Sequence, residues 1–174
     1  MQLSKSPLIT AHEINERIAL LAQQISIDYA GKDLVFLIVL KGAAIFGSDL
    51  MRQLTIPVAV DYLRARSYRG VNSTGRVEFT LLPEENLAGR HVLIVEDILD
   101  TGFTTAAIRE ALSAHKPASL RICTLLDKPA PRVADIHAEY VGFTIDNAFV
   151  VGYGLDYDGA HRHLPAIYVM EEIS

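Results

Sequence analysis

The pattern of apolar and polar residues switches repeatedly between helical and strand-like spacing along the 174-residue chain. The first helical stretch opens with a capping box made by Thr10 and Glu13, and it predicts an amphipathic helix over residues 11–27. The continuous branched run LVFLIVL at 34–40 predicts a strand that is buried on both faces.

The later segments continue this alternation. Apolar residues at helical spacing predict a helix over 43–54, and a second helical pattern at 108–115 ends at a Lys-Pro pair. Short branched runs predict strands at 57–63, 77–82, 91–95, 119–126, 138–142, 148–152 and 166–170. Alternating strands and helices predict an α/β fold with a mainly parallel central sheet flanked by helices.

Residues 64–76, RARSYRGVNSTGR, interrupt the pattern with four arginines, two glycines and no aliphatic run. We expect a flexible loop between antiparallel strands, because these residues supply no apolar surface to offset the entropy lost on ordering. The loop is a candidate lid in which Ser67 and Tyr68 close over the reacting centre and exclude water.

Length, composition and charge limit the class of protein. A chain of 174 residues forms about one domain, and its longest apolar run, seven residues, is too short to span a membrane. The net charge of −5 opposes broad binding of nucleic acid or anionic lipid. The N-terminal residues lack a signal-peptide pattern, and Cys123 is the single cysteine. We expect a cytoplasmic protein with no nucleic-acid or membrane partner, and Cys123 is assigned no role.

Candidate chemistry concentrates in HVLIVEDILDTGFTT, residues 91–105. A buried strand leads through Glu96, Asp97 and Asp100 into a turn with threonines and a glycine at the start of a helix. Helix N-termini bind phosphate through free N–H groups, and adjacent carboxylates suit ribose hydroxyls or hydrated Mg²⁺. The segment therefore predicts a ribose-phosphate site. Taken singly, each acid has a structural alternative: Glu96 and Asp97 end a strand, and Asp100 caps a helix.

The segment VLIVEDILDTGFT resembles the phosphoribosyl-pyrophosphate signature of the type I phosphoribosyltransferases, most closely in their hypoxanthine and hypoxanthine-guanine branch. The resemblance extends through VLKGAAIFGSDL at 39–50, SYRG at 67–70, STGRV at 73–77, LLDKP at 125–129 and FVVGYGLDYDGAHRHLP at 149–165. It implies one phosphoribosyltransferase domain over residues 1–174, with a core at about 30–150 and a small hood built from the N-terminal and C-terminal segments. It also implies a homodimer or homotetramer.

The resemblance implies that Glu96 and Asp97 hold the ribose hydroxyls, directly or through Mg²⁺, and that the loop at 100–105 binds the 5′-phosphate. Asp100 is the implied catalytic residue, because a carboxylate near N7 of a purine can accept the N7 proton as a general base. The residues implied for ribose and 5′-phosphate are Glu96, Asp97, Asp100, Thr101, Gly102, Phe103, Thr104 and Thr105.

For pyrophosphate, the resemblance implies Leu40, Lys41, Gly42, Ser67, Tyr68 and Arg162. Lys41 and Gly42 follow a buried strand, where an ammonium and a glycine amide can reach an anion, although a Lys-Gly pair alone is more often an ordinary turn. The Leu40-Lys41 peptide bond is expected to be cis, as in some relatives. Arg162 is expected to pair with pyrophosphate through two parallel hydrogen bonds.

For the purine, the resemblance implies Lys128, Phe149, Val150 and Asp156. Lys128 would donate to the 6-oxo group and so select oxopurines over adenine, Phe149 would stack on the base, and Val150 would supply backbone contacts. Asp156 would reach a second Mg²⁺ through water, which makes the implied metal set Glu96, Asp97 and Asp156. Surface solvation or core packing is the alternative for each of these residues taken alone.

Two positions depart from the family pattern. Phe103 stands where some relatives carry a basic residue, so the backbone must carry more of the phosphate contact. His161 stands where an aromatic residue is common, which alters the packing near Arg162. His161 and His163 form a weak candidate pair for zinc, and no zinc is expected.

The resemblance implies transfer of 5-phosphoribosyl from phosphoribosyl pyrophosphate to hypoxanthine, and to guanine as well, giving IMP or GMP and pyrophosphate, with Mg²⁺ as cofactor. The alternative is a regulatory protein on the same fold that binds the sugar pyrophosphate or a nucleotide without catalysis. Such a regulator would show a basic face and could lose Asp100 and Lys128, whereas this acidic chain retains both. An adenine or xanthine substrate would stay in the same reaction class.

Overall fold

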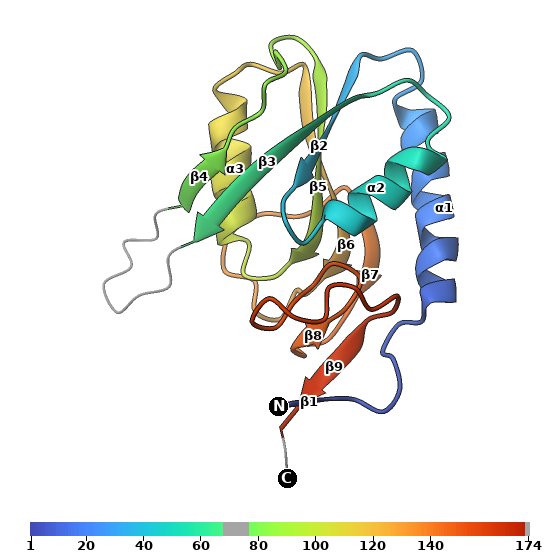
Figure 1. Cartoon of the computed structure of the whole chain (residues 1–174). Coiled ribbons are helices and arrows are strands. Elements are labelled where there is room, and N and C mark those ends of the chain that lie inside the picture. Colours follow the sequence, from blue (N-terminus) through green and yellow to red (C-terminus); the bar gives the residue numbers. More distant parts are fainter. Residues whose placement is uncertain (68–76, 173–174) are drawn as a thin grey trace.

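The computed structural model describes residues 1–67 and 77–172. The strands are β1 (Gln2–Leu3), β2 (Leu34–Val39), β3 (Ala59–Ser67), β4 (Val77–Leu81), β5 (His91–Leu99), β6 (Ser119–Asp127), β7 (Tyr140–Thr144), β8 (Val150–Val151) and β9 (Tyr168–Glu171). The helices are α1 (Ala11–Asp28), α2 (Ala44–Gln53) and α3 (Phe103–Ser113). The described strands form one sheet in the order β4-β3-β2-β5-β6-β7 and a smaller one in the order β1-β9-β8 (Figure 1).

The central sheet is parallel except at one edge. β2 pairs in parallel with β3 and β5, β6 pairs in parallel with β5 and β7, and β4 runs antiparallel to β3. In Figure 1, α1 and α2 lie on one side of this sheet and α3 lies on the other. The predicted α/β fold with a mainly parallel sheet between helices is confirmed.

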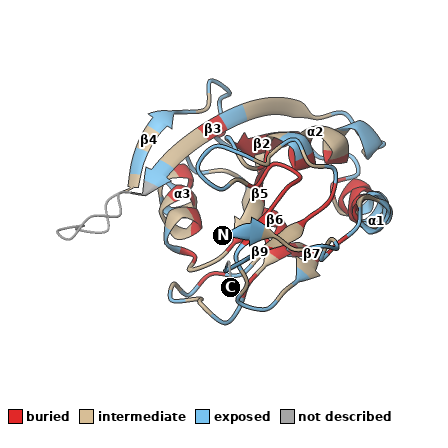
Figure 2. Cartoon of the chain, turned by 60° about the horizontal axis from the view of Figure 1, so that its bottom comes forward, coloured by how far each residue is buried: buried red, intermediate tan, exposed pale blue. Residues whose placement is uncertain are grey.

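The core has two parts, one on each face of the sheet. Phe36 and Ile38 of β2 pack with apolar residues of α1 and α2, whereas Val35 and Leu37 pack with Ile108 and Leu112 of α3. Successive strand residues point to opposite faces, so a strand covered on both sides must be apolar at every position. All six residues of β2 are buried accordingly, and Figure 2 shows buried residues on the inner strands and the inward helix faces.

The first helix begins where its sequence predicts. The side-chain oxygen of Thr10 accepts from the Glu13 N–H at 3.2 Å, and Glu13 Oε2 accepts from the Thr10 N–H at 2.8 Å. This capping box satisfies N–H groups that have no partner within the helix. It confirms the predicted start of α1 and fixes the direction from which the N-terminal segment enters.

The smaller sheet lies beyond the ends at which β2, β5 and β6 point (Figure 1). β9 pairs antiparallel with β1 through Met170 and Glu171 and with β8 through Tyr168 and Val169. Residues near both ends of the chain are therefore joined over the carboxyl edge of the central sheet. This sheet corresponds to the hood of the expected fold, although β1 has no sequence pattern that predicts it.

Four residues of the loop expected at 64–76 belong to a strand instead. Residues 64–67 belong to β3 and pair with β4, because the antiparallel ladder continues the strand beyond its parallel neighbour. Tyr68 and the rest of the expected lid, 68–76, lie outside the described residues. β5 is also longer than predicted, so that Glu96 and Asp97 lie inside the strand rather than after it.

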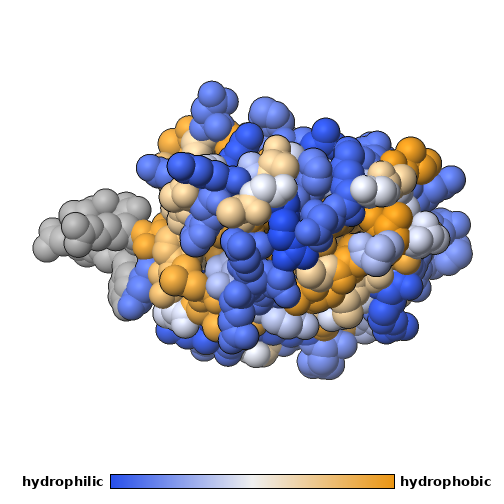
Figure 3. All heavy atoms as spheres, turned by 90° about the horizontal axis from the view of Figure 1, so that it is seen from above, coloured by the Kyte–Doolittle hydropathy of each residue, from blue (hydrophilic) through white to orange (hydrophobic). Residues whose placement is uncertain are grey.

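The opposite edge of the sheet holds a surface ion-pair cluster. Arg90, just before β5, contacts Asp33 through two nitrogens at 2.8 Å and Glu85 at 2.5 Å. Viewed from that side, hydrophilic side chains cover the middle of the surface (Figure 3).

No helix in the described part of the chain is long and apolar enough to cross a membrane.

Candidate active site

The carboxyl ends of β2, β5 and β6 meet at one edge of the central sheet, because the three strands are parallel and adjacent. β2 leads into the turn at residues 41–42, β5 carries Glu96 and Asp97 near its end, and β6 leads into Lys128. The segment from Gly152 to Leu164, here called the 152–164 loop, returns to this edge. Most of the predicted site residues therefore gather at one place in the fold.

The two adjacent acids of β5 differ in exposure, because Glu96 is buried and Asp97 is half-buried. Glu96 is buried, and burial, followed by the neighbouring Asp97 carboxylate, raises the pKa of Glu96 well above its ordinary value. Burial also raises the pKa of Asp97 to about 6, although the backbone N–H groups of Ile98 and Asp97 and the Arg162 guanidinium favour its charged form. Enclosed acids with raised pKa values are typical of functional sites, where a bound cation restores the charged form.

The turn at residues 41–42 lies in contact with Asp97. A Cβ added at Gly42 would stand 1.6 Å from Asp97 Oδ2, so only glycine leaves room for this carboxylate. Lys41 is exposed, and the Leu40-Lys41 peptide bond is cis, as the resemblance implied. On its other side, Gly42 lies against Gly154, where an added Cβ would stand 2.1 Å from the Gly42 carbonyl oxygen.

Asp100 and Lys128 face each other across the ends of β5 and β6. Lys128 Nζ lies 3.9 Å from Asp100 Oδ2, and the Lys128 side chain is almost fully buried. Asp100 Oδ1 is buried and has no hydrogen-bond partner within the described residues. A buried acceptor without a donor is costly, so a donor from a ligand is the natural partner for this atom.

The turn before α3 leaves the helix N-terminus open. Gly102 is the N-cap residue with φ +84°, and no side chain within the described residues caps α3. The structural alternative in which Asp100 caps this helix is therefore wrong. Phe103 begins α3 and is exposed, while Thr105 is buried at 3% exposure. The uncapped N–H groups are available for an anion, as the phosphate interpretation requires.

Arg132 holds this turn and is a residue that sequence reasoning missed. Its guanidinium donates to the carbonyl oxygens of Asp100 at 2.7 Å, Leu99 at 2.8 Å and Ile136 at 2.8 Å, and it pairs with the Asp127 carboxylate. The two residues that follow it, 133 and 134, add N–H groups that donate to the Thr101 carbonyl. One side chain thus joins the ends of β5 and β6, which lead into Asp100 and Lys128.

The 152–164 loop brings Asp156 and Arg162 together. Arg162 donates to Asp156 Oδ1 at 2.7 Å and to the Gly154 carbonyl at 2.5 Å. The carboxylate of Asp156 also contributes to the raised pKa of Asp97, which places both residues beside the strand acids. His161, the departure from the family pattern, has φ +74°, a left-handed conformation that non-glycine residues rarely adopt.

Two residues predicted to contact the base, Phe149 and Val150, differ in exposure. Phe149 is 46% exposed, and its ring meets Tyr157 edge-on with centroids 5.6 Å apart. Val150 is buried in β8, where it pairs with Val169 of β9. Ser67 ends β3, and Tyr68 lies outside the described residues. Cys123 is fully buried, and burial raises the pKa of its thiol, in agreement with assigning it no role.

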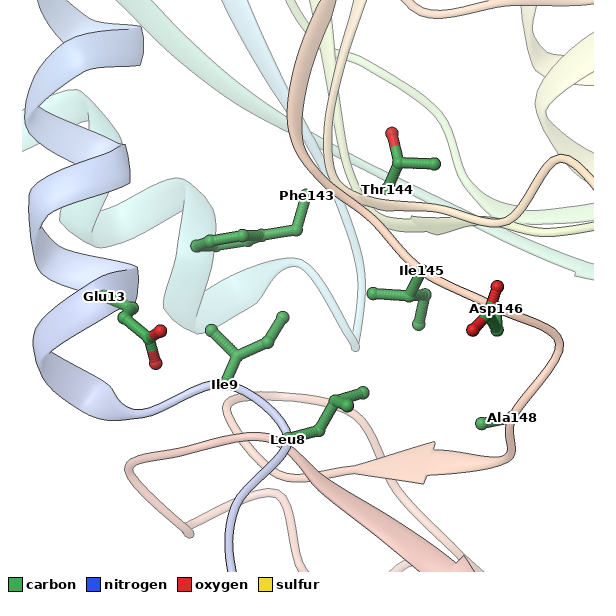
Figure 4. A pocket seen from close by; sticks show the side chains of 8 residues that line it. All are labelled: Leu8, Ile9, Glu13, Phe143, Thr144, Ile145, Asp146 and Ala148. Carbon is green, nitrogen blue, oxygen red and sulfur yellow. The ribbon is translucent and has the colours of Figure 1, made fainter.

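A separate pocket of about 430 Å³ lies between the start of α1 and the chain that follows β7 (Figure 4). Its lining residues are Leu8, Ile9, Glu13, Phe143, Thr144, Ile145, Asp146 and Ala148. None of the predicted site residues lines this pocket. The Glu13 carboxylate at its wall is already engaged in the capping box with Thr10.

The acids of the site fit a substrate-borne Mg²⁺ better than a resident metal. The described residues contain no group of three or more His, Cys, Asp or Glu side chains able to hold a metal ion. Mg²⁺ needs no such group, because it keeps several waters and binds one or two carboxylates together with substrate phosphates. The adjacent pair Glu96 and Asp97, with Asp156 nearby, matches that donor set.

Comparison with known proteins agrees with this geometry. Residues 8–158 match the model of the phosphoribosyl transferase domain family. The chain is 44% identical over 163 residues to the hypoxanthine phosphoribosyltransferase of Salmonella typhimurium, covering 92% of each chain. It is 42% identical over 174 residues to the hypoxanthine-guanine phosphoribosyltransferase of Mycobacterium bovis, covering 96% of this chain and 86% of that one.

Solved structures show the same likeness. A crystal structure of a hypoxanthine phosphoribosyltransferase from Staphylococcus aureus superimposes with a TM-score of 0.92 at 43% identity, covering 96% of this chain and 91% of that one. Fold, site geometry and sequence comparison therefore lead to one conclusion: the chain belongs to the phosphoribosyltransferase family.

Proposed function

We propose that the chain transfers the 5-phosphoribosyl group of phosphoribosyl pyrophosphate to hypoxanthine or guanine, which yields IMP or GMP and pyrophosphate. The observation that carries this proposal is the Asp100 and Lys128 pair, with Asp100 Oδ1 buried and unpartnered within the described residues. An acceptor beside a buried ammonium matches the N7–H donor and the 6-oxo acceptor on one edge of an oxopurine. The names of the similar proteins support the same substrates.

The phosphoribosyl part of the substrate is assigned to β5 and α3. The open N-terminus of α3, at Thr101 to Thr105, binds the 5′-phosphate through backbone N–H groups, with Gly102 allowing close approach. Glu96 and Asp97 bind the ribose hydroxyls. Because Phe103 supplies no charge, the neutral backbone carries the contact with the 5′-phosphate.

The pyrophosphate is assigned to the side of the site formed by the turn at 41–42 and the 152–164 loop. Lys41 and Arg162 offset the negative charge that develops on the leaving pyrophosphate. Glu96 and Asp97 would hold Mg²⁺ together with the substrate, and Asp156 would reach a second Mg²⁺ through water. The ions would supply charge neutralisation at the phosphates. Arg162 and Asp156 pair with each other, and each would exchange this partner for pyrophosphate or Mg²⁺.

In the transfer step, N9 of the base forms a bond to C1 of the ribose while the bond from C1 to the pyrophosphate oxygen breaks. The base then carries an extra proton, and Asp100 accepts it at N7. Lys128 donates to the 6-oxo group and orients the base, with Phe149 against its face. These residues position the two substrates, which is the main task when a dissociative reaction must avoid hydrolysis.

The regulatory alternative has less support, because Asp100 and Lys128 are arranged for a base that a pure sensor does not need. The test is pyrophosphate release from phosphoribosyl pyrophosphate with hypoxanthine, guanine, xanthine or adenine, each with and without Mg²⁺. We expect release with hypoxanthine and guanine only when Mg²⁺ is present. Binding of the sugar pyrophosphate without release for any base would favour the regulatory alternative.

A further inference from the structure

We propose that Tyr153 and Asp49 form a positioning pair that holds the 152–164 loop against the turn at residues 41–42. This inference rests on the proposed function, since it concerns the pyrophosphate side of that site. Neither residue touches the assigned substrates. Both would act through the groups they hold in place.

The pair joins two segments that are far apart in the sequence. The Tyr153 O–H donates to Asp49 Oδ2 at 2.6 Å. Asp49 lies in α2, the helix that follows the turn at residues 41–42 directly, and Tyr153 is buried. Burial and the Asp49 carboxylate raise the pKa of Tyr153, so the phenol remains a hydrogen-bond donor at neutral pH.

The backbone around Tyr153 needs such an anchor. Tyr153 has φ +50° between Gly152 and Gly154, each at φ +100°. A tyrosine in the left-handed region is held there by its surroundings rather than by its own preference. Its N–H donates to the Leu164 carbonyl at 2.8 Å, and the side chain supplies a second attachment through Asp49.

The anchored residue is next to the point where the loop meets the site. Gly154 lies against the Gly42 carbonyl, its N–H donates to the Arg162 carbonyl at 3.0 Å, and its own carbonyl accepts from the Arg162 guanidinium. A shift of Tyr153 would therefore move both Gly42 and Arg162. These are residues assigned to pyrophosphate. Of the residues assigned to the base, Lys128 and Asp100 lie on other segments, and Phe149 and Val150 precede the loop and are held by β9. Asp156, which lies on the loop, is assigned to Mg²⁺.

The experiment compares steady-state kinetics of Tyr153→Phe and Asp49→Ala with those of the wild-type enzyme. Losing one hydrogen bond to a charged group predicts a KM for phosphoribosyl pyrophosphate raised roughly five- to twentyfold, with the KM for hypoxanthine within about twofold. Asp49→Asn keeps an acceptor and should restore most of the affinity. Tyr153→Phe combined with Asp49→Ala should be no worse than either single change, because the two residues share one interaction.

Arg52→Ala is the matched control, because Arg52 Nη1 approaches the same Asp49 carboxylate at 3.5 Å from an exposed position. It should leave both KM values unchanged. Equal changes of both KM values in Tyr153→Phe, or no change in either, would overturn the pair. Lack of transfer by the wild-type enzyme would instead refute the proposed function. Hydrogen exchange at the Gly154 amide then tests whether Tyr153 and Asp49 hold the loop in place. Unchanged exchange in Tyr153→Phe would contradict this role, and faster exchange would support it.

Discussion

Arg132 donates its Nε hydrogen to the main-chain oxygen of Asp100 at 2.7 Å, so the guanidinium holds the backbone of the proposed general base without touching its carboxylate. The same side chain pairs with the Asp127 carboxylate at the end of β6. Lys128 follows Asp127 directly, so the separation of Asp100 and Lys128 depends on Arg132.

Arg132→Lys should therefore damage both stability and turnover. A lysine cannot reproduce the planar set of donors, and several buried carbonyls would lose their partner. We expect the free energy of unfolding in urea to fall by roughly 2–4 kcal/mol and kcat to fall by at least tenfold. Arg52→Lys on the exposed face of α2 is the control. A stable, fully active Arg132→Lys enzyme would show that Arg132 is not needed to hold the ends of β5 and β6 together.

Asp100→Asn should remove the general base and leave the fold intact. The amide keeps the size of the side chain, and since Asp100 does not cap α3, no capping interaction is lost. We expect kcat to fall by about two to four orders of magnitude with little change in binding of phosphoribosyl pyrophosphate. Asp146→Asn, an exposed acid after β7, should retain normal turnover. Near-normal turnover in Asp100→Asn would remove this carboxylate from the proton transfer.

Lys128→Ala should weaken the base more than the sugar pyrophosphate. The 6-oxo group would lose its donor at a cost of roughly 1–3 kcal/mol, and Lys128→Gln should lose less because it keeps a neutral donor. Titration of hypoxanthine and of phosphoribosyl pyrophosphate into each variant measures the two affinities separately. If the two affinities fell by the same factor, Lys128 would not belong to the base pocket.

Asp97→Asn should change how stability depends on pH. The pKa of Asp97 is raised to about 6 in the folded protein, above its ordinary value near 3.8, so folding binds a proton between these values. Its contribution is therefore fully present below pH 3.8 and is lost as pH rises through about 6. We expect Asp97→Asn to gain thermal stability relative to wild type as pH rises from 4 to 7, without Mg²⁺. If the difference in Tm between Asp97→Asn and wild type stayed the same from pH 4 to 7, the raised pKa of Asp97 would be contradicted.

Gly42→Ala should weaken substrate binding in a protein that still folds. The added methyl group would overlap Asp97 Oδ2, so that either the carboxylate or the turn must move. We expect weaker binding of phosphoribosyl pyrophosphate with Mg²⁺, measured by calorimetry, and a small change in hypoxanthine binding. Gly31→Ala, at φ +73° with nothing within 4 Å, strains the backbone away from the site, so it should lower stability and leave both affinities unchanged. Wild-type affinity in Gly42→Ala would show that this close contact is not needed.

The central fold and the grouping of Glu96, Asp97 and Asp100 near the start of α3 could be predicted because their signals are local. The branched run of β2, the capping box of α1 and the segment around Glu96 and Asp97 each lie within a few consecutive residues. Such patterns depend on helix and strand periodicity and on the chemistry of neighbouring side chains. The structure then confirms the elements and lengthens β5 by the ladder it forms with β6.

The features that the sequence did not predict depend on contacts between distant segments. Arg132 follows a proline-rich turn, and nothing in its neighbourhood shows that its donors reach carbonyls more than thirty positions earlier. Tyr153 and Asp49 are 104 positions apart. β1 has two residues and forms only because β9 lies beside it. In each case the two partners lie far apart in the sequence, and only the fold brings them together.

The pairing of β9 with both β1 and β8 also sets the order in which the site can be completed during synthesis. The strand acids, Asp100 and the start of α3 leave the ribosome well before residues 168–171. β9 holds β8 and the Phe149 carbonyl in place, the latter through the Met170 N–H at 2.8 Å. A nascent chain can therefore assemble the proposed phosphate site early. The segment proposed to contact the base becomes fixed only when β9 has emerged and paired with β1 and β8.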